Sequence, residues 1–386
     1  MIDANAHRRP PAATVDAAEE RPLRIAGIDP ERGFAGGETQ VLGLTRELRR
    51  MGHRAELICD PAGKLIERAQ SEGIRCHPLR LRNAIDVAGA MRLRAILARE
   101  RYDVVHFHTS KAHAMAPFVR GLAPALVVTR RMDYRPNRLF APYLFSRAVD
   151  GVAAISRGVR DALEAAGVAR DRIRIIPSGV DTGYFRPPAP EERAAARLVL
   201  GIASGAVAAG TVGMLEARKG HRYLLEAIAR MAGDVVCLIA GDGSLRDELE
   251  ELARTLGIEN RTRFVGRIED SRAFLWALDI FVFPSLWEGL GVAAIEAAAC
   301  GLATVASGAG GIVEVVSHGE TGIVVAPADS SALACAIERL AASPADRAAM
   351  GDAARSRAVT MFAMSGMAER TLALYRECLR TRKDRA

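Results

Sequence analysis

The sequence lacks a hydrophobic run long enough to span a membrane. No apolar stretch in its 386 residues reaches the roughly 18 residues that a transmembrane helix needs. The first twenty residues mix Ala, Pro, Arg, Asp and Glu, which is not the pattern of a signal peptide. We therefore expect a cytoplasmic protein in which residues 1–20 form a disordered tail.

Cysteine and lysine are both scarce. The six cysteines are scattered without a Cys-x-x-Cys pair, so the spacing of a zinc site or a disulfide framework is absent. A reducing cytoplasm is the simplest compartment for such thiols. Only four of the 53 basic residues are Lys. No basic and aromatic module or helix-turn-helix pattern accompanies the arginines, so we expect no nucleic-acid partner.

The charge is unevenly divided between the two halves of the chain. Residues 21–185 contain 28 Lys and Arg against 17 Asp and Glu, whereas residues 186–386 contain 23 against 25. A basic half suits an anionic lipid surface or an acidic acceptor. A general preference for Arg explains the same excess equally well. Peripheral association with the inner face of the cell membrane therefore stays open.

Short apolar runs alternate with helical patterns along most of the chain. This length exceeds one ordinary core and suits two domains, and the alternation predicts a parallel sheet with helices on both faces in each. We expect domains at 21–185 and 201–360, a linker at 186–200 and a C-terminal helix at 361–386. The expected strands are 23–28, 55–59, 74–79, 104–107, 126–129, 151–155, 173–176, 206–212, 235–240, 263–265, 279–283, 304–306 and 323–325.

The most informative stretch runs from Phe283 to Gly301. A short buried strand ends at Phe283, a Pro-Ser break and a Gly-rich turn follow, and an Ala-rich helix then ends at Gly301. Glycines before a helix let a ligand approach free backbone N–H groups, and the helix dipole favours an anion there. Glu288 in the turn and Glu296 in the helix would contact different parts of one ligand. In isolation, such a Glu pair is typical of a solvated strand-turn-helix.

The residues around the Glu pair make the pattern specific. Pro-Ser-x-x-Glu-Gly-x-Gly begins at Pro284, seven residues separate the two Glu, and Glu-Ala-x-Ala-Cys-Gly begins at Glu296. This pattern resembles the signature of glycosyltransferase family 4. Members of that family are retaining enzymes with the GT-B fold, in which two Rossmann-like, doubly wound α/β domains face each other across a cleft. The resemblance covers residues 23–376 and is strongest from 205 to 330.

The resemblance implies a function for each domain. The N-terminal domain would lie on the acceptor side, the C-terminal domain would bind a nucleotide sugar, and the helix at 361–386 would pack back on the N-terminal domain. The enzyme would move a sugar from a nucleoside-diphosphate sugar to a lipid-linked or other glycan acceptor, of the kind used for cell-envelope polysaccharide or lipopolysaccharide. The donor sugar, its base, the linkage and the acceptor depend on a few pocket contacts.

On the donor side, the resemblance implies a role for each part of the signature. Glu288 would face the donor sugar and Glu296 would hold the ribose. The turn would bind the diphosphate, and the residues after the strand at 263–265 would contact the base. The residues expected to bind the donor, besides Glu288 and Glu296, are Gly289, Leu290, Gly291, Arg267 and Ile268.

Cations are expected beside the departing diphosphate. The family usually has Arg directly after the first Gly of the segment Gly213–Gly220, where this chain has Met214. Lys219 matches the family, and Arg218 is the candidate replacement for the missing charge. Such cations clamp a diphosphate and neutralise the leaving group as the sugar departs.

The acceptor side is expected at the carboxyl ends of the first strands, where ligands of parallel sheets bind. Gly36 and Gly37 match the family's first loop, and His108 ends a strand that matches its Asp-Val-Val-His-x-His pattern. The family often has His after the next strand, where this chain has Arg131. Arg131 in that place suits an anionic acceptor.

No metal and no cofactor are expected. The sequence contains no Asp-x-Asp, the carboxylate pair that holds Mn²⁺ or Mg²⁺ in the other large glycosyltransferase fold. Lys219, together with Arg218 and a helix N-terminus, would supply the electrostatic stabilisation instead.

Two other enzyme classes stay open as alternatives. A nucleotide-sugar epimerase of the same two-domain shape also binds diphosphate in its cleft but needs no acceptor. A dehydrogenase is suggested by the stretch from Gly289 to Ala294, which formally fits Gly-x-Gly-x-x-Ala. That motif normally occupies the first strand-helix turn of a domain, so a lone match here is weak.

Overall fold

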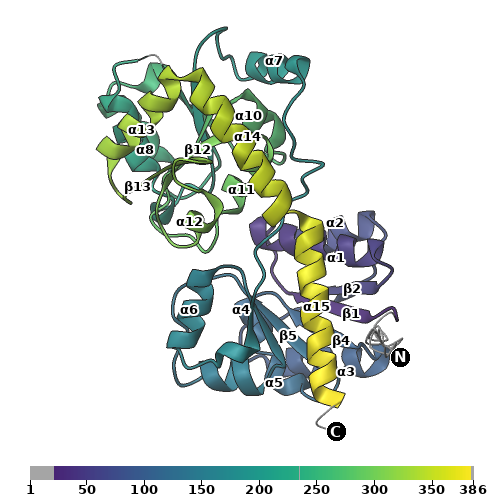
Figure 1. The fold of residues 1–386 in the computed structure, drawn as a ribbon. Coiled ribbons are helices and arrows are strands. Elements are labelled where there is room, and N and C mark those ends of the chain that lie inside the picture. The colour runs from purple at the N-terminus through teal and green to yellow at the C-terminus, as the bar shows by residue number, and fades with distance from the viewer. Residues whose placement is uncertain (1–20, 234, 384–386) are drawn as a thin grey trace, which may run out of the picture.

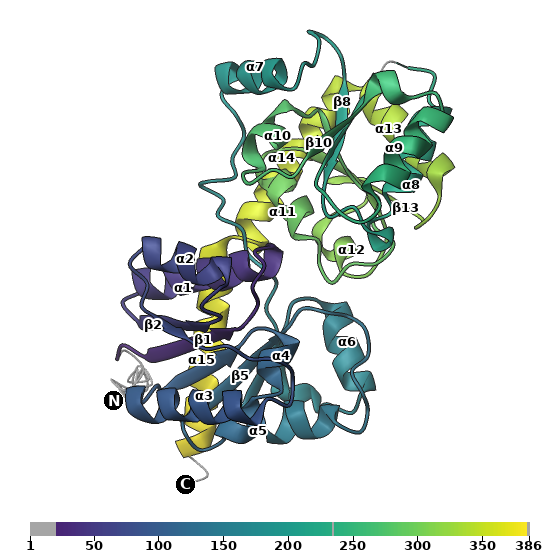
Figure 2. The same ribbon diagram turned by 180° about the vertical axis from the view of Figure 1, so that it is seen from behind.

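The computed structural model describes residues 21–233 and 235–383, so the tail expected at residues 1–20 lies outside the described part. Two parallel sheets, of seven and six strands, form the centres of two domains (Figures 1 and 2). This arrangement confirms the predicted α/β fold class. Among the described helices, none combines the length and the hydropathy needed to cross a bilayer.

The first sheet has the order β3-β2-β1-β4-β5-β6-β7. Helices cover both of its faces, so its central strands are almost continuously apolar and buried, as parallel strands usually are. Its strands are β1 (Arg24–Asp29), β2 (Arg54–Cys59), β3 (Cys76–Pro78), β4 (Val104–Phe107), β5 (Ala125–Arg130), β6 (Gly151–Ala154) and β7 (Ile173–Ile175).

The two faces of the first sheet carry different helices. Helices α1 and α15 pack together on the face seen in Figure 1, while α3 and α5 lie on the opposite face seen in Figure 2. Side chains cap several of these helices. At the start of α3, for example, Asp86 accepts from the backbone N–H of Gly89 at 2.9 Å. The helices of this domain are α1 (Gly36–Arg50), α2 (Lys64–Ser71), α3 (Val87–Glu100), α4 (Ser110–His113), α5 (Ala116–Val119), η2 (Tyr143–Arg147), α6 (Arg157–Ala165) and η3 (Arg170–Arg172).

The second sheet has the order β10-β9-β8-β11-β12-β13. One core cluster lies under α8, α9 and α13, and another lies under α10, α11 and α14. Its strands are β8 (Ala208–Val212), β9 (Val236–Ala240), β10 (Thr262–Gly266), β11 (Ile280–Phe283), β12 (Ala303–Ser307) and β13 (Gly322–Val325). The remaining helices are α7 (Pro190–Val199), η4 (Ala217–Lys219), α8 (His221–Arg230), α9 (Arg246–Thr255), η5 (Glu259–Arg261), α10 (Arg272–Ala277), α11 (Val292–Ala299), α12 (Ile312–Val315), α13 (Ser330–Ala342), α14 (Pro344–Met361) and α15 (Met364–Lys383).

The chain crosses between the domains twice, and the two crossings are hydrogen-bonded to each other. The backbone of Val180 donates to the carbonyl of Phe362 at 2.8 Å and accepts from Met364 at 2.9 Å. The side-chain amide of Gln40 in α1 both donates to and accepts from the backbone of Gly179 at 2.8 Å. Helix α15 then shares a core with β1, β4 and β5 of the first domain.

Residues 190–199, inside the expected linker, form helix α7. Its Arg193 and Arg197 make ion pairs with Asp279 at 2.7 and 3.0 Å. The same helix packs against α10. This part of the segment therefore packs on the second domain.

Each sheet has one point where the direction of its crossovers reverses. In the first sheet this switch point lies between β1 and β4, and in the second it lies between β8 and β11. Ligands of doubly wound sheets bind at such points, outside the carboxyl ends of the strands. The predicted donor residues after β8 and β11 therefore surround the switch point of the second sheet.

Candidate active site

Loops from the two domains meet at these switch points. The Trp287 ring lies 5.8 Å from the Tyr134 ring of the first domain. A Cβ on Gly289 would overlap the carbonyl oxygen of Arg131, so the two backbones are in direct contact. The loop after β11 is thus packed against the loop after β5, and the structure brings predicted donor and acceptor residues together.

An ion pair lies at the centre of the donor side. The Lys219 ammonium donates to the Glu288 carboxylate, and both side chains are largely buried, at 15% and 16% exposure. The Arg218 guanidinium is 4.0 Å from the same carboxylate and donates to Glu216 at 3.0 Å. A diphosphate entering here would compete with Glu288 for these cations.

Backbone contacts explain why Lys219 reaches Glu288. Gly220, directly after Lys219, has a φ of 65°, and a Cβ there would overlap the carbonyl oxygen of Pro284. The backbone N–H of Leu286 donates to the carbonyl of Arg218 at 2.8 Å. The loops after β8 and β11 are therefore held together by their backbones, and Gly at position 220 permits this approach.

Helix α11 begins directly after the Gly-rich turn, as the signature predicts. Gly291 precedes it with a φ of 94°, a conformation that favours Gly. Leu290 is buried and packs in the core of the domain. The backbone N–H of Gly311 donates to the carbonyl of Glu288 at 2.9 Å, which fixes the turn from the other side.

Glu296 lies in α11 beside a second loop of the donor domain. Its carboxylate accepts from the Ser271 hydroxyl at 3.3 Å. Burial raises the pKa of Glu296 to about 7, although the hydrogen bond from Ser271 opposes that shift. Arg267, which is exposed, and Ile268, which is partly buried, precede Ser271 in the same loop. The predicted ribose and base residues therefore lie in two adjoining segments.

Three charged side chains, Asp29, Glu38 and Arg131, form a polar group at the carboxyl end of β1, in the first domain. Asp29 is 1% exposed, and its Oδ2 atom has no hydrogen-bond partner among the described residues. Burial raises the pKa of Asp29 to about 7, and the Glu38 carboxylate adds to the shift. Burial lowers the pKa of Arg131 to about 10, although Asp29 and Glu38 both attract its charge. Buried polar atoms without partners mark this group as a place where a ligand would be bound.

The two histidines in and directly after β4 differ in their surroundings. His106 lies inside the strand and is hydrogen-bonded to Tyr375 at 2.6 Å and to Thr129 at 2.7 Å, so it is a core residue. His108 stacks on it at 3.9 Å between ring centroids, and its Nδ1 atom lacks a partner within the described chain. Burial, with His106 and Arg131 adding to it, keeps the pKa of His108 well below its ordinary value. His108 is therefore a neutral ring.

Gly36 and Gly37 form the first turn of helix α1. A Cβ on either residue would meet nothing within 4 Å, so the helix N-terminus is open. The Glu38 carboxylate accepts from the backbone N–H of Ala35 at 2.8 Å. The structure thus presents an accessible N-terminus next to the polar group of Asp29, Glu38 and Arg131.

Sequence reasoning missed two carboxylates of this region. Asp29 is the last residue of β1 and lies at the edge of the sheet where ligands bind. Its place at the end of the first predicted strand could have identified it as a candidate site residue. Asp133 lies in the loop after β5, and its Oδ2 atom is 2.8 Å from the place a Cβ on Gly310 would occupy. Burial raises the pKa of Asp133, and the nearby Glu288 contributes to the shift. No sequence pattern pointed to this contact between domains.

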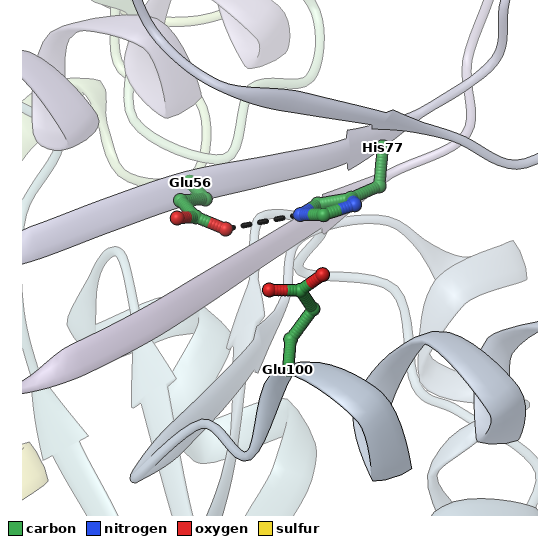
Figure 3. A group of neighbouring side chains, drawn as sticks. All are labelled: Glu56, His77 and Glu100. Carbon is green, nitrogen blue, oxygen red and sulfur yellow. Dashed lines mark hydrogen bonds and ion pairs between the residues drawn. The ribbon is translucent and has the colours of Figure 1, made fainter.

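Among the described residues, one trio of side chains has the spacing of a metal site. Glu56, His77 and Glu100 point toward one another in Figure 3, and Glu56 is 3.0 Å from the His77 ring. Burial alone would raise the pKa of Glu56, but hydrogen bonds from Tyr102, His77 and Arg54 outweigh it and lower that pKa to about 2.

The charges around this trio are those of a structural ion-pair network. Arg75 contacts Glu100 at 3.0 Å and Glu56 at 3.5 Å. Arg54 adds a contact with Glu56 at 2.5 Å. Guanidinium groups thus already neutralise both carboxylates, which disfavours a bound cation there.

Comparisons with known proteins agree with this geometry. Residues 34–184 match the family model described as Glycosyltransferase Family 4, and residues 193–357 match the model described as Glycosyl transferases group 1. The chain is 30% identical over 383 residues to an alpha-maltose-1-phosphate synthase of Mycolicibacterium smegmatis, covering 90% of this chain and 97% of that protein. It is also 30% identical over 284 residues to the lipopolysaccharide core biosynthesis glycosyltransferase LpsE of Rhizobium meliloti, covering 74% and 78%.

Solved structures share the fold. The crystal structure of Anabaena HepE in complex with UDP superposes with a TM-score of 0.84 at 22% identity, covering 92% of this chain and 100% of that one. Such a likeness shows that the two α/β domains are arranged as in the GT-B glycosyltransferases.

Proposed function

Because the chain belongs to glycosyltransferase family 4, we propose that this glycosyltransferase transfers a sugar from a nucleoside diphosphate to a lipid-linked or other glycan acceptor with retention of configuration. The observation that carries the proposal is the Lys219–Glu288 ion pair at the switch point of the second sheet. It lies beside the Gly-rich turn of the signature, where an anion meets both cations and free backbone N–H groups. Complexes of Anabaena HepE with UDP and with UDP-glucose support a donor of this class.

In the proposed reaction, Lys219 and Arg218 neutralise the diphosphate as it leaves. The bond between the anomeric carbon and the phosphate oxygen breaks, and oxocarbenium character develops on the sugar. The acceptor hydroxyl attacks on the same face and gives its proton to the leaving phosphate. Glu288 faces the sugar and Glu296 accepts hydroxyl hydrogens of the ribose. No metal ion is needed in this scheme, because side-chain cations supply the positive charge.

The acceptor is proposed to bind at the polar group of the first domain. Arg131 would hold an anionic part of the acceptor, and the Asp29 carboxylate, with its free Oδ2 atom, would accept from a hydroxyl group. The relationship to the lipopolysaccharide core enzyme LpsE supports an acceptor of the cell envelope.

Calorimetric titration tests the donor half of this proposal. UDP, GDP, ADP and NAD would be titrated without metal into the wild type and into Lys219→Ala. We expect one nucleoside diphosphate to bind and the substitution to weaken it. Binding of NAD alone, or of none of the nucleotides, would overturn the proposal.

Product analysis tests the transfer itself. Incubation of the matching nucleotide sugar with an envelope glycan acceptor should give a product whose anomeric configuration, read by NMR, equals that of the donor. Excess chelator should leave the rate unchanged. Conversion of the nucleotide sugar to its epimer without any acceptor would instead identify an epimerase.

A further inference from the structure

One face of the first domain exposes large apolar side chains. Six of them are between 53% and 83% exposed. They come from α3, from the loop before it, and from the segment that connects β5 to β6. The six residues, which we call the apolar face, are Ile85, Val87, Met91, Leu139, Phe140 and Tyr143.

Helix α3 exposes two large apolar side chains on its solvent side, where Arg92 and Arg99 are exposed as well. Asp86 caps the helix and is only 9% exposed, so the start of α3 offers no free carboxylate. Val87 and Met91 are 62% and 60% exposed and lie one helical turn apart. An isolated exposed apolar residue needs no explanation, but a row of them on one face marks an interaction surface.

The segments of this face lie on the same side of the sheet. Figure 2 shows α3 and α5 in front of the sheet, opposite α15. The β5–β6 segment is held beside them, because the Phe145 ring is 5.9 Å from that of His113 in α4. On its other flank, Arg138 donates to the carbonyl of Ala165 in α6 at 3.1 Å. The six side chains therefore belong to two crossovers of one layer, β3–β4 and β5–β6, with α4 and α5 of the β4–β5 crossover between them.

The charge around the apolar face is almost entirely positive. Residues 79–99, 110–121 and 134–149, which include α3, α4, α5 and η2, contain ten Lys and Arg and one acidic residue, the buried Asp86. Three of the ten cations are already paired, Lys111 with Glu31 at 3.3 Å, Arg99 with Glu100 at 3.1 Å and Arg92 with Asp86 at 3.9 Å. The acids just beyond these ranges are engaged elsewhere. Glu100 is bound by Arg75 and Arg99 at 3.0 and 3.1 Å, and Asp133 faces Gly310 of the second domain. Asp150 accepts from the backbone N–H of Leu126 at 2.9 Å.

We propose that the apolar face docks the enzyme on an anionic lipid surface. The exposed Ile, Val, Met, Leu, Phe and Tyr side chains would enter the headgroup region, and the surrounding arginines would pair with lipid phosphates. Helix α3 follows β3, whose carboxyl end lies at the same sheet edge as Asp29. Docking through α3 would therefore bring the acceptor side of the cleft close to the membrane.

Docking on a lipid surface would give the enzyme access to a lipid-linked acceptor, and in this respect the inference rests on the proposed function. The charge pattern selects the lipid over other occupants. A second copy of the chain would bring two positively charged surfaces against each other, and an acidic protein groove is expected to engage charges more than six exposed apolar side chains.

Vesicle flotation tests the proposal. Wild-type protein would be mixed with vesicles of phosphatidylcholine alone or of equal parts phosphatidylcholine and phosphatidylglycerol. We expect binding to the anionic vesicles, little binding to the neutral ones, and a loss of binding when salt rises from about 0.1 M to about 0.5 M, where screening is strong.

Matched variants locate the surface. Leu139→Ser with Phe140→Ser should weaken vesicle binding about tenfold or more, since both insertion points are lost. The control is Leu198→Ser with Val199→Ser in α7 of the second domain, where the two side chains are 81% and 85% exposed. This control should bind vesicles like the wild type. UDP titration and thermal melting check that each variant is folded.

The outcomes separate this inference from the proposed function. Equal vesicle binding by the two double variants would overturn the apolar face as the docking surface. Equal binding to neutral vesicles, or no vesicle binding with dimers in light scattering, would overturn the lipid assignment. Each of these results leaves nucleotide binding and sugar transfer unaffected, whereas failure of all three nucleoside diphosphates to bind, with intact vesicle binding, would count against the transferase alone.

Discussion

The backbone carbonyl of Arg131, in the first domain, lies directly against Gly289, in the second. A Cβ at position 289 would overlap that oxygen and would lie 3.3 Å from the Ile155 side chain, also of the first domain. Gly289 follows Glu288 in the signature turn. The absence of a side chain there is what allows donor and acceptor loops to touch, and the residue has a role in closure beside its predicted role in donor binding.

We expect Gly289→Ala to lower kcat by about tenfold or more, because misplacing reacting groups by about 1 Å can cost about 100-fold. Nucleoside-diphosphate binding should change little, since the backbone N–H groups of the turn remain. Steady-state kinetics and calorimetry measure the two effects. Gly233→Ala is the control, because a Cβ there meets nothing within 4 Å. An unchanged kcat in Gly289→Ala would show that the contact is not needed for turnover.

Lys219 should contribute more to donor binding than Arg218. We expect Lys219→Ala to weaken nucleoside-diphosphate binding about tenfold to 100-fold, since it removes a charge-assisted contact from a largely buried place. Arg218→Ala should cost less, because the Arg218 side chain is 38% exposed, against 15% for Lys219, and a contact nearer to solvent is weaker. Calorimetry measures both constants.

The exposed Lys64 provides the matched control for Lys219. Lys64→Ala should bind the nucleotide like the wild type. Equal binding by Lys219→Ala and Lys64→Ala would rule out a diphosphate contact at Lys219.

Periodicity and turn chemistry were enough to predict two α/β domains with parallel sheets, whereas the GT-B arrangement of the domains was implied by the family resemblance. The strands read from apolar runs agree with the observed ones to within about two residues in nearly every case. The parallel arrangement followed from the alternation of strands and helices. The helical structure of residues 190–199 was not predicted. The helix is held in place by tertiary contacts, such as the ion pairs of Arg193 and Arg197 with Asp279, and these cannot be read from the local sequence.

The donor side was more readable from the sequence than the acceptor side. Glu288, Gly289 and Glu296 lie in one continuous motif, so local spacing identifies them. Asp29 and Asp133 act with residues far away in the sequence, and Asp133 meets the second domain only after both domains have folded. Burial, which sets their pKa values, has no local signature in the chain.

Asp29 should make the protein less stable as the pH rises. Its pKa is about 7 in the folded protein, against an ordinary value of 3.8. Below pH 4 the carboxyl is protonated in both states and contributes nothing. Between pH 4 and 7 the unfolded chain releases the proton first, so stability falls by up to about 1.4 kcal/mol per pH unit.

Asp29→Asn removes this titration. We expect urea unfolding to show a flatter decline in stability between pH 4 and 7 than in the wild type, and a variant that is more stable than the wild type at pH 8. The same variant should have a raised acceptor KM, because Asn cannot accept with a charged oxygen. Asp247→Asn, at an exposed position, should retain the wild-type pH dependence. Parallel curves for Asp29→Asn and the wild type would mean that Asp29 does not titrate in this range.

A buried hydrogen bond should help to hold helix α15 on the first domain. It adds to the apolar side of the helix and to surface contacts, in which Arg174 donates to Glu377 at 3.1 Å and Arg382 donates to the carbonyl of Ala123 at 2.7 Å. The Tyr375 hydroxyl is 2.6 Å from Nδ1 of His106, and both residues are buried. Tyr375→Phe keeps the shape of the ring but leaves the His106 nitrogen without a partner. An unsatisfied buried group of this kind costs about 1–3 kcal/mol.

We therefore expect Tyr375→Phe to lower the free energy of unfolding by about that amount in urea titrations. Tyr143→Phe, which removes a hydroxyl at a side chain that is 53% exposed, is the control and should be neutral. Nucleotide binding should be unchanged in both, because the contact lies away from the donor loops. A neutral Tyr375→Phe would mean that the apolar packing and the surface contacts of α15 hold the helix on the sheet without this hydrogen bond.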